Sequence, residues 1–162
     1  MEPTFIMAAL AVLIIACVVI LMIKPFDPKR VVLIQLAAAL EMIVRLSQAR
    51  PEDMAHLGQS DLLPLIRQWQ EIAQHPGLEP NLWSPDQFTQ FARDALRRVK
   101  AAARDLGVNR QGRAKDCIAA LEDLVRYSGE WMYVGGWERR RARRQIQMAA
   151  EDVRDACRLT PA

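Results

Sequence analysis

The sequence predicts an all-α protein with one N-terminal transmembrane helix, followed by a cytoplasmic bundle of about five helices. Three observations predict this fold class. Residues 4–23 contain no charged side chain, apolar residues recur at helical spacing through the rest of the chain, and no segment shows the alternation typical of a strand. At 162 residues, with 51% hydrophobic and 25% charged residues, the chain suits one small domain plus an extra apolar element.

The apolar run at residues 4–23 is long enough to cross a bilayer. At about 1.5 Å per residue, a helix of this length spans roughly 30 Å, which matches the hydrocarbon core. A cleaved signal peptide is the alternative, and it would need a positive n-region and a cleavage site with small residues. Glu2 is the only charged side chain before the run, which ends in the bulky sequence LMIKPF. We therefore expect a retained anchor.

Basic residues on one side of the predicted span set its orientation. Lys24, Lys29 and Arg30 follow the span, and no Lys or Arg precedes it. The positive-inside rule therefore places the N-terminus outside and the rest of the chain in the cytoplasm. The Ala- and Arg-rich composition favours a bacterial inner membrane. The predicted segments are an extracytoplasmic N-terminus (1–3), the transmembrane helix (4–23), a juxtamembrane linker (24–30), a helical cytoplasmic domain (31–159) and a tail (160–162).

The first helix of the bundle is predicted over 28–49. Asp27 can act as its N-cap, and Pro28 then occupies the first helical position. Most faces of this helix are apolar, which indicates a helix buried in the domain or lying at the membrane surface. A second span or a re-entrant segment is the alternative, but only ten uncharged residues separate Arg30 from Glu41.

Four more helices follow at the expected spacing. They are predicted over 61–75, 85–106, 112–128 and 136–158. Ser60 is the expected N-cap of the first, and Ser84 with Gln87 has the pattern of a capping box for the second. Gly129 is expected to end the third, and the pair Gly135–Gly136 allows a tight turn before the fourth.

The residues that carry catalytic chemistry do not occur in recognisable patterns. His56 and His75 have no Cys or His at the spacing of metal ligands. The chain has no glycine-rich phosphate loop, nucleophile elbow or dinucleotide-binding fingerprint. Cys17, Cys117 and Cys157 form no C-x-x-C pair, and we interpret them as small buried hydrophobes. We therefore predict no catalytic residue, no metal and no cofactor, and a protein that is not an enzyme.

Positive charge is concentrated in two places. The net charge of +3 is too small to argue for nucleic acid, but residues 93–116 hold eight basic and three acidic residues. A spacing of 4, 3 and 4 places four of these basic residues on one helix face: Arg93, Arg97, Lys100 and Arg104. A solvated helix face and a docking surface for an acidic partner or anionic lipid are the two interpretations.

The second concentration is the segment EWMYVGGWERRRARR at 130–144. Cations in the first turn of a helix oppose its dipole, so an anion outside the bundle is expected to face them. The aromatics could instead close the bundle end, form a partner hot spot or stack on bases. The candidate residues for partner or anionic-lipid binding are Trp131, Tyr133, Trp137, Arg139, Arg140, Arg143 and Arg144.

These observations predict a non-enzymatic, single-pass membrane protein. Its cytoplasmic domain is expected to scaffold, assemble or regulate a larger membrane complex. Other membrane subunits and anionic lipid headgroups are the expected partners, the latter because each basic residue near an anionic leaflet adds about 1 kcal/mol of attraction. A membrane-tethered nucleic-acid-binding module is the alternative, although the chain carries no RNA-recognition signature.

Overall fold

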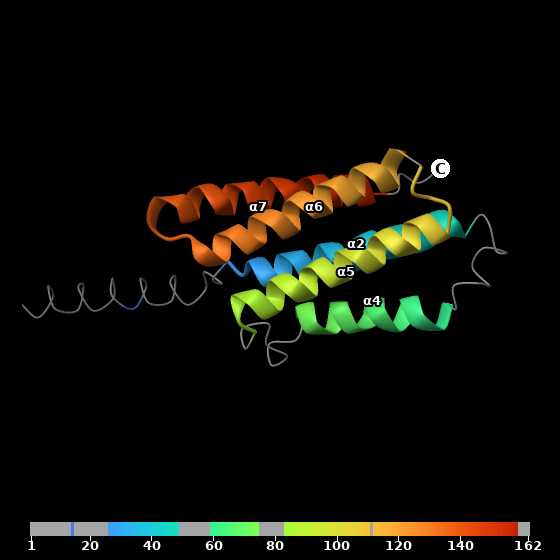
Figure 1. Cartoon of the computed structure of the whole chain (residues 1–162), viewed down its shortest axis with the longest axis horizontal. Helices are drawn as coiled ribbons and strands as arrows, with labels where there is room; N and C mark the ends of the chain where they lie inside the picture. The colour runs from blue at the N-terminus through green and yellow to red at the C-terminus, as the bar shows by residue number, and fades with distance from the viewer. Residues whose placement is uncertain (1–13, 15–25, 49–58, 75–82, 111, 159–162) are drawn as a thin grey trace, which may run out of the picture.

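The computed structural model describes residues 14, 26–48, 59–74, 83–110 and 112–158. This part of the chain is all-α and contains no strand, so the predicted fold class is confirmed for it. The helices pack into a bundle (Figure 1). They are α2 (Pro28–Ser47), α4 (Gln59–Gln74), α5 (Pro85–Asp105), α6 (Gly112–Tyr133) and α7 (Gly136–Cys157).

Helix α2 lies at the centre of the bundle and contacts α4, α5, α6 and α7. Leu33, Leu36 and Leu40 are fully buried along it. Because four helices enclose α2, apolar residues occur on most of its faces. Its polar side is a strip that includes Gln35 and the exposed Arg45, which pairs with Glu41. The expectation of a helix buried in the domain is correct.

Local capping signals set where α2 and α5 begin. The Asp27 side chain accepts a hydrogen bond from the Lys29 backbone amide at 3.0 Å. At the start of α5, the Ser84 hydroxyl accepts from the Gln87 amide at 3.2 Å, and the Gln87 side chain accepts from the Ser84 amide at 3.0 Å. Both helices have proline in the first turn. These contacts satisfy amides that a helix start otherwise leaves without partners.

Neighbouring helices run antiparallel in the pairs α2/α4, α5/α6 and α6/α7 (Figure 1). One end of the bundle, which we call the turn end, holds the starts of α2 and α5 and the α6–α7 connection. Two contacts define it: the Phe26 ring meets Trp131, and the Tyr133 hydroxyl donates to Asp86. At the opposite, far end the Arg113 guanidinium donates to the Arg158 carbonyl at 2.8 Å.

Two predicted helix boundaries are wrong. Helix α6 continues through Gly129 to Tyr133, whereas the sequence analysis ends it at Gly129. A Cβ added at Gly129 would lie 3.6 Å from Thr89 of α5, an ordinary contact, and the chain does not reverse there. Helix α4 begins at Gln59, so Ser60 lies inside it and is not its N-cap.

The predicted transmembrane helix at 4–23 lies outside the described residues except for Ile14, which is helical and exposed. Among the helices that the structure describes, none combines the length and apolarity needed to cross a bilayer. That finding includes α2, for which a second span was the alternative. The predicted tail at 160–162 also lies outside the described residues.

Candidate functional site

Four side chains from three segments form an aromatic–arginine cluster at the turn end: Phe26, Trp131, Arg139 and Arg143. The rings of Phe26 and Trp131 meet edge to face, with centroids 6.1 Å apart and an interplanar angle of 70°. The Arg139 Cζ lies 4.4 Å from the centroid of Trp131, and the Arg143 Cζ lies 4.8 Å from that of Phe26. Each guanidinium therefore sits at cation–π distance from one ring.

The sequence brings these groups together through the α6–α7 turn. The extension of α6 beyond Gly129 carries Trp131 to the end of the bundle. Gly136 then adopts a φ of +58°, a backbone conformation that residues other than glycine rarely adopt, and the chain reverses into α7. Arg139 and Arg143 are four residues apart and share one face of α7, which points them at the two rings.

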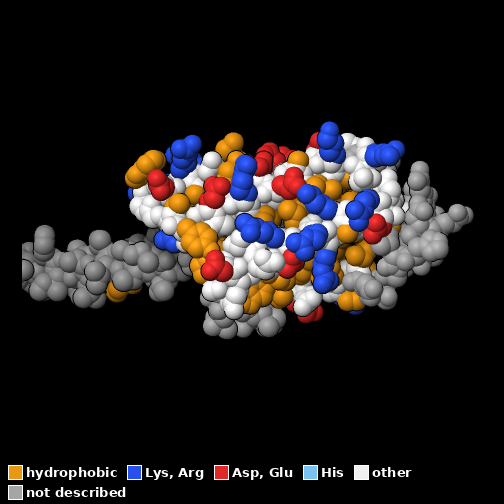
Figure 2. Space-filling view, viewed as in Figure 1, with side chains coloured by type: hydrophobic (Ala, Val, Ile, Leu, Met, Phe, Trp, Pro, Cys, Tyr) orange, Lys and Arg blue, Asp and Glu red, His pale blue; other side chains and the backbone are white. Residues whose placement is uncertain are grey.

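The remaining arginines of α7's first turns face outward. Together with Trp137, we call them the outer patch: Trp137, Arg140, Arg141 and Arg144. Trp137 is 72% exposed. The three arginines are exposed, and within the described residues none of them forms an ion pair or stacks on a ring. Figure 2 shows hydrophobic and basic side chains together at this end of the bundle.

Tyr133, the last residue of α6, bonds to α5. It is 62% exposed, and its hydroxyl donates to the Asp86 carboxylate. This hydrogen bond holds the phenol in its neutral form and raises the pKa of Tyr133 above its usual value. Tyr133 thus connects the α6–α7 turn to the first turn of α5.

The basic residues that flank the predicted span also bind within the bundle. Lys29 donates from Nζ to the Trp83 carbonyl at 2.7 Å, and Arg30 lies 3.5 Å from the Asp27 carboxylate. Lys24 is outside the described residues. The two described cations fix the entry of the chain into α2.

The predicted basic face of α5 is largely paired with acids. Arg97 contacts Asp94 at 3.1 Å, Arg104 contacts Asp105 at 3.5 Å, and Lys100 pairs with Glu122 of α6. These pairs lie in solvent, where each contributes little stability. In Figure 2 acidic side chains lie among the basic ones on this face. This arrangement fits a solvated helix face better than a concentrated anion site.

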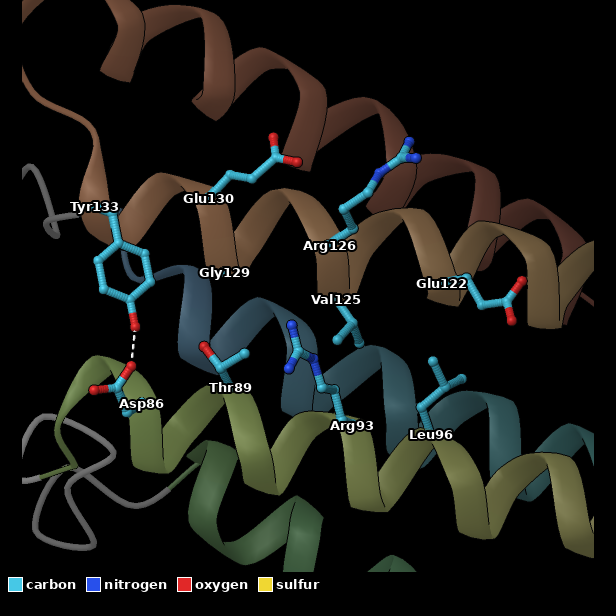
Figure 3. Close-up of a pocket in the computed structure, with 10 residues that line it drawn as sticks. All are labelled: Asp86, Thr89, Arg93, Leu96, Glu122, Val125, Arg126, Gly129, Glu130 and Tyr133. Atoms are coloured by element: carbon cyan, nitrogen blue, oxygen red, sulfur yellow. Dashed lines mark hydrogen bonds between the residues drawn. The ribbon is translucent and has the colours of Figure 1, made fainter.

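Arg93 differs from its neighbours because it lines a groove of about 540 Å³ between α5 and α6 (Figure 3). Glu130 and Arg126 stand on the α6 side of this groove, and Val125 lies on its floor. Charges of both signs therefore line it. The groove shows no convergence of acid, base and nucleophile that would indicate catalysis.

A second groove, of about 560 Å³, runs between α2 and α7. Its lining includes Val31 and Gln35 from α2, and Arg144 and Met148 from α7. Met148 is 64% exposed, and Ile34, on the same helix as Val31, is 48% exposed. Glu151 and Arg154 also line the groove, so it combines the exposed Met148 side chain with charges of both signs, including Arg144 of the outer patch.

No cluster of three His, Cys, Asp or Glu side chains that could hold a metal ion occurs among the described residues. His56 and His75 lie outside them.

Comparison of the chain with protein-family models, curated proteins and solved structures finds no match.

Two features of the site were missed by the sequence analysis. Phe26 was not a candidate, although it completes the aromatic–arginine cluster. Cys117 and Cys157 were interpreted separately, and the structure places their sulfur atoms 3.3 Å apart. Forty residues separate the two cysteines, so no local sequence pattern could have indicated that they meet.

Proposed function

We propose that this protein is a non-enzymatic, single-pass membrane protein whose helical domain scaffolds or regulates a larger membrane complex. One observation carries the proposal. Phe26 follows the end of the predicted span at residue 23 by three positions, and it packs against Trp131 and Arg143 at the turn end. A bilayer anchor at 4–23 would therefore deliver the aromatic–arginine cluster and the outer patch to the membrane surface.

The chemistry of the outer patch suits that surface. Tryptophan favours the headgroup layer, and each arginine near an anionic leaflet adds about 1 kcal/mol of attraction. The positive charges of Arg139 and Arg143 interact favourably with aromatic rings. Among the described residues, Arg140, Arg141 and Arg144 have no such ring partner. Anionic headgroups would pair with these three arginines. The cytoplasmic orientation follows from the basic flank of the span.

The α2–α7 groove supports docking of a protein subunit. It presents the exposed side chain of Met148 and adjoins the turn end through Arg144. Methionine packs adaptably against partner surfaces. If the anchor holds the turn end at the membrane, a subunit embedded in the same membrane would lie close to this groove.

Charge reversal tests the lipid contact. Arg140→Glu/Arg144→Glu alters two exposed arginines that contact no aromatic ring, so the bundle is expected to fold normally. The matched control is Arg110→Glu/Lys115→Glu, which makes the same change in net charge at the far end. Each full-length variant is reconstituted in vesicles, with or without phosphatidylglycerol, and digested with limiting protease. We expect the first variant alone to lose protection of the α6–α7 turn by anionic lipid.

The same variants distinguish the alternatives. Equal protection in the two variants would contradict lipid contact at the outer patch. A nuclease-sensitive association that only Arg140→Glu/Arg144→Glu abolishes would favour the tethered nucleic-acid module instead. Release of the parent protein from membranes by alkaline carbonate would contradict the anchor itself.

The scaffold role is tested by extraction in mild detergent and identification of co-purifying proteins. Met148→Glu is expected to lose a subunit that the parent protein retains, because it replaces the exposed apolar side chain of the groove with a charge. Asn109→Glu adds the same charge at the far end and is expected to retain it. Loss of the subunit from both variants, or from neither, would argue against docking in the α2–α7 groove.

A further inference from the structure

Two cysteines meet at the far end of the α6–α7 pair. The Sγ atoms of Cys117 and Cys157 lie 3.3 Å apart, and both thiols are free. Cys117 is fully buried in the second turn of α6, and Cys157 is the last residue of α7. Two thiols in contact across two helices form a potential cross-link.

Bond formation requires only a small movement. A disulfide has a sulfur–sulfur distance of about 2.05 Å, so the two atoms must approach by roughly 1.3 Å. Cys157 ends α7, and the next residue, Arg158, already has an extended backbone. The terminal turn can therefore adjust without disturbing the core, whereas Cys117 is fixed by burial between the packed helices.

Cys157 is also accessible from solvent. It lines a pocket of about 180 Å³ whose other walls come from α2, among them Ala38, Glu41 and Met42. A small oxidant such as a peroxide fits this volume. Cys117 is fully buried and does not line this pocket.

We propose that Cys117 and Cys157 form an oxidation site that a peroxide converts to a disulfide between α6 and α7. The Cys157 thiolate attacks a peroxide oxygen, so that an S–O bond forms, the O–O bond breaks and the leaving hydroxide takes up a proton to give water. The Cys117 sulfur then attacks the sulfenic acid. The S–S bond forms, the S–O bond breaks, and hydroxide leaves with the Cys117 proton as a second water. The two thiols lose two electrons, which the peroxide accepts.

The environment assigns different roles to the two sulfurs. A hydrogen bond from the Cys117 thiol lowers the pKa of Cys157, which makes it the nucleophile. The same hydrogen bond and burial raise the pKa of Cys117, which stays protonated until the sulfenic acid forms. Cys117 is therefore the resolving thiol.

The bond would close the open end of the α6–α7 pair. The turn at Gly136 already joins these helices at the turn end, so a disulfide at the far end would link both ends. Cross-links across loops of this size stabilise proteins mainly by restricting the unfolded chain. We expect oxidation to raise the unfolding temperature by roughly 5 to 10 °C.

The test uses the full chain with Cys17→Ala, which removes the remaining cysteine, purified in detergent and treated with hydrogen peroxide. We expect the intact mass to fall by two hydrogen atoms, and non-reducing digestion to yield a peptide that contains both cysteines. Dithiothreitol should reverse both changes and the rise in unfolding temperature. In Cys117→Ala, dimedone should trap a sulfenic acid on Cys157.

Two results would overturn the proposal. One is oxidation of Cys157 to the sulfinic acid in the parent protein while Cys117 stays free. The other is cross-linking only between different molecules, seen as covalent dimers. Circular dichroism of Cys117→Ala checks its fold, and the mass of the peroxide-treated parent decides the matter whether or not that variant folds.

Discussion

The guanidinium of Arg143 lies over the ring of Phe26, with 4.8 Å between Cζ and the ring centroid. This contact joins the start of α7 to the residue that leads into α2, across more than a hundred positions of the sequence. It gives this arginine a favourable contact in the second half of the arginine-rich segment 139–144. It also places the basic segment beside the point where the predicted anchor joins the domain.

We predict an energetic coupling between Phe26 and Arg143. Phe26→Leu keeps an apolar side chain but removes the ring, and Arg143→Gln removes the charge. Urea unfolding of the full chain in detergent should give a coupling free energy of about 0.5 to 1 kcal/mol in a double-mutant cycle. The control cycle of Phe26→Leu with Arg140→Gln should show none. Equal coupling in both cycles would mean that long-range charge, and not the ring contact, is measured.

Two glycines of the same region should respond in opposite ways to alanine. Gly129 lies inside α6 with ordinary space around its Cβ position, so Gly129→Ala should stabilise the fold by about 0.5 to 1 kcal/mol. Gly136 has a φ of +58°, so Gly136→Ala should destabilise it by about 1 kcal/mol. Denaturant midpoints measure both effects. Gly136→Asn should recover part of the loss, because asparagine tolerates this conformation better than alanine does.

The Ser84 cap should contribute to the stability of α5. Ser84→Ala removes the acceptor for the Gln87 amide and should cost about 1 kcal/mol in thermal or urea unfolding. Ser84→Asp keeps an acceptor at the same place and should be close to neutral. If both substitutions destabilise equally, the hydroxyl acts through some contact other than the cap.

Much of the fold could be predicted because its signals are local. Two helix starts are predicted by patterns of a few residues, Asp27–Pro28 and Ser84–Pro85–Gln87, and the structure confirms both. The end of α6 could not be predicted in this way. Gly129 is compatible with both a stop and a continuous helix, and the structure shows a continuous helix at this position.

The site was less accessible from sequence because its contacts are distant along the chain. Helical spacing correctly pairs Arg139 with Arg143, but it cannot show which rings they meet. Nothing in the spacing distinguishes these two arginines, which stack on rings, from Arg140 and Arg144, which do not. That difference depends on Phe26 and Trp131, which approach from other segments.

The reactivity of the two cysteines should depend on pH in different ways. Because the hydrogen bond from Cys117 lowers the pKa of Cys157, alkylation of Cys157 by iodoacetamide should reach half its maximal rate at a lower pH in the parent protein than in Cys117→Ala. Cys117 should react far more slowly throughout, because its pKa is raised. Charged groups near Cys157 include Glu41 and Arg45 of α2, which line the same pocket, Arg113 of α6, which donates to the carbonyl of the next residue, and the neighbouring Arg158–Asp155 pair.

Peptide mapping of the alkylated protein between about pH 6 and pH 9 measures both rates. Arg45→Gln serves as the control for the neighbouring ion pair. It should shift the midpoint less than Cys117→Ala, which removes the hydrogen bond to Cys157. A larger shift from Arg45→Gln would assign the lowered pKa to the guanidinium instead.

The central claim is that the turn end of the bundle faces the membrane, and energy transfer from the protein to the bilayer surface tests it most directly. A fluorescent amino acid is placed at position 137, or at position 109 in a matched protein, and the full chain is reconstituted in vesicles with an acceptor dye on lipid headgroups. Position 137 lies in the first turn of α7 at the turn end, and position 109 lies between α5 and α6 at the far end, so the length of α6, roughly 30 Å, separates them along the bundle. We predict strong transfer from position 137 and weak transfer from position 109. Equal transfer from both positions, or stronger transfer from position 109, would contradict the account.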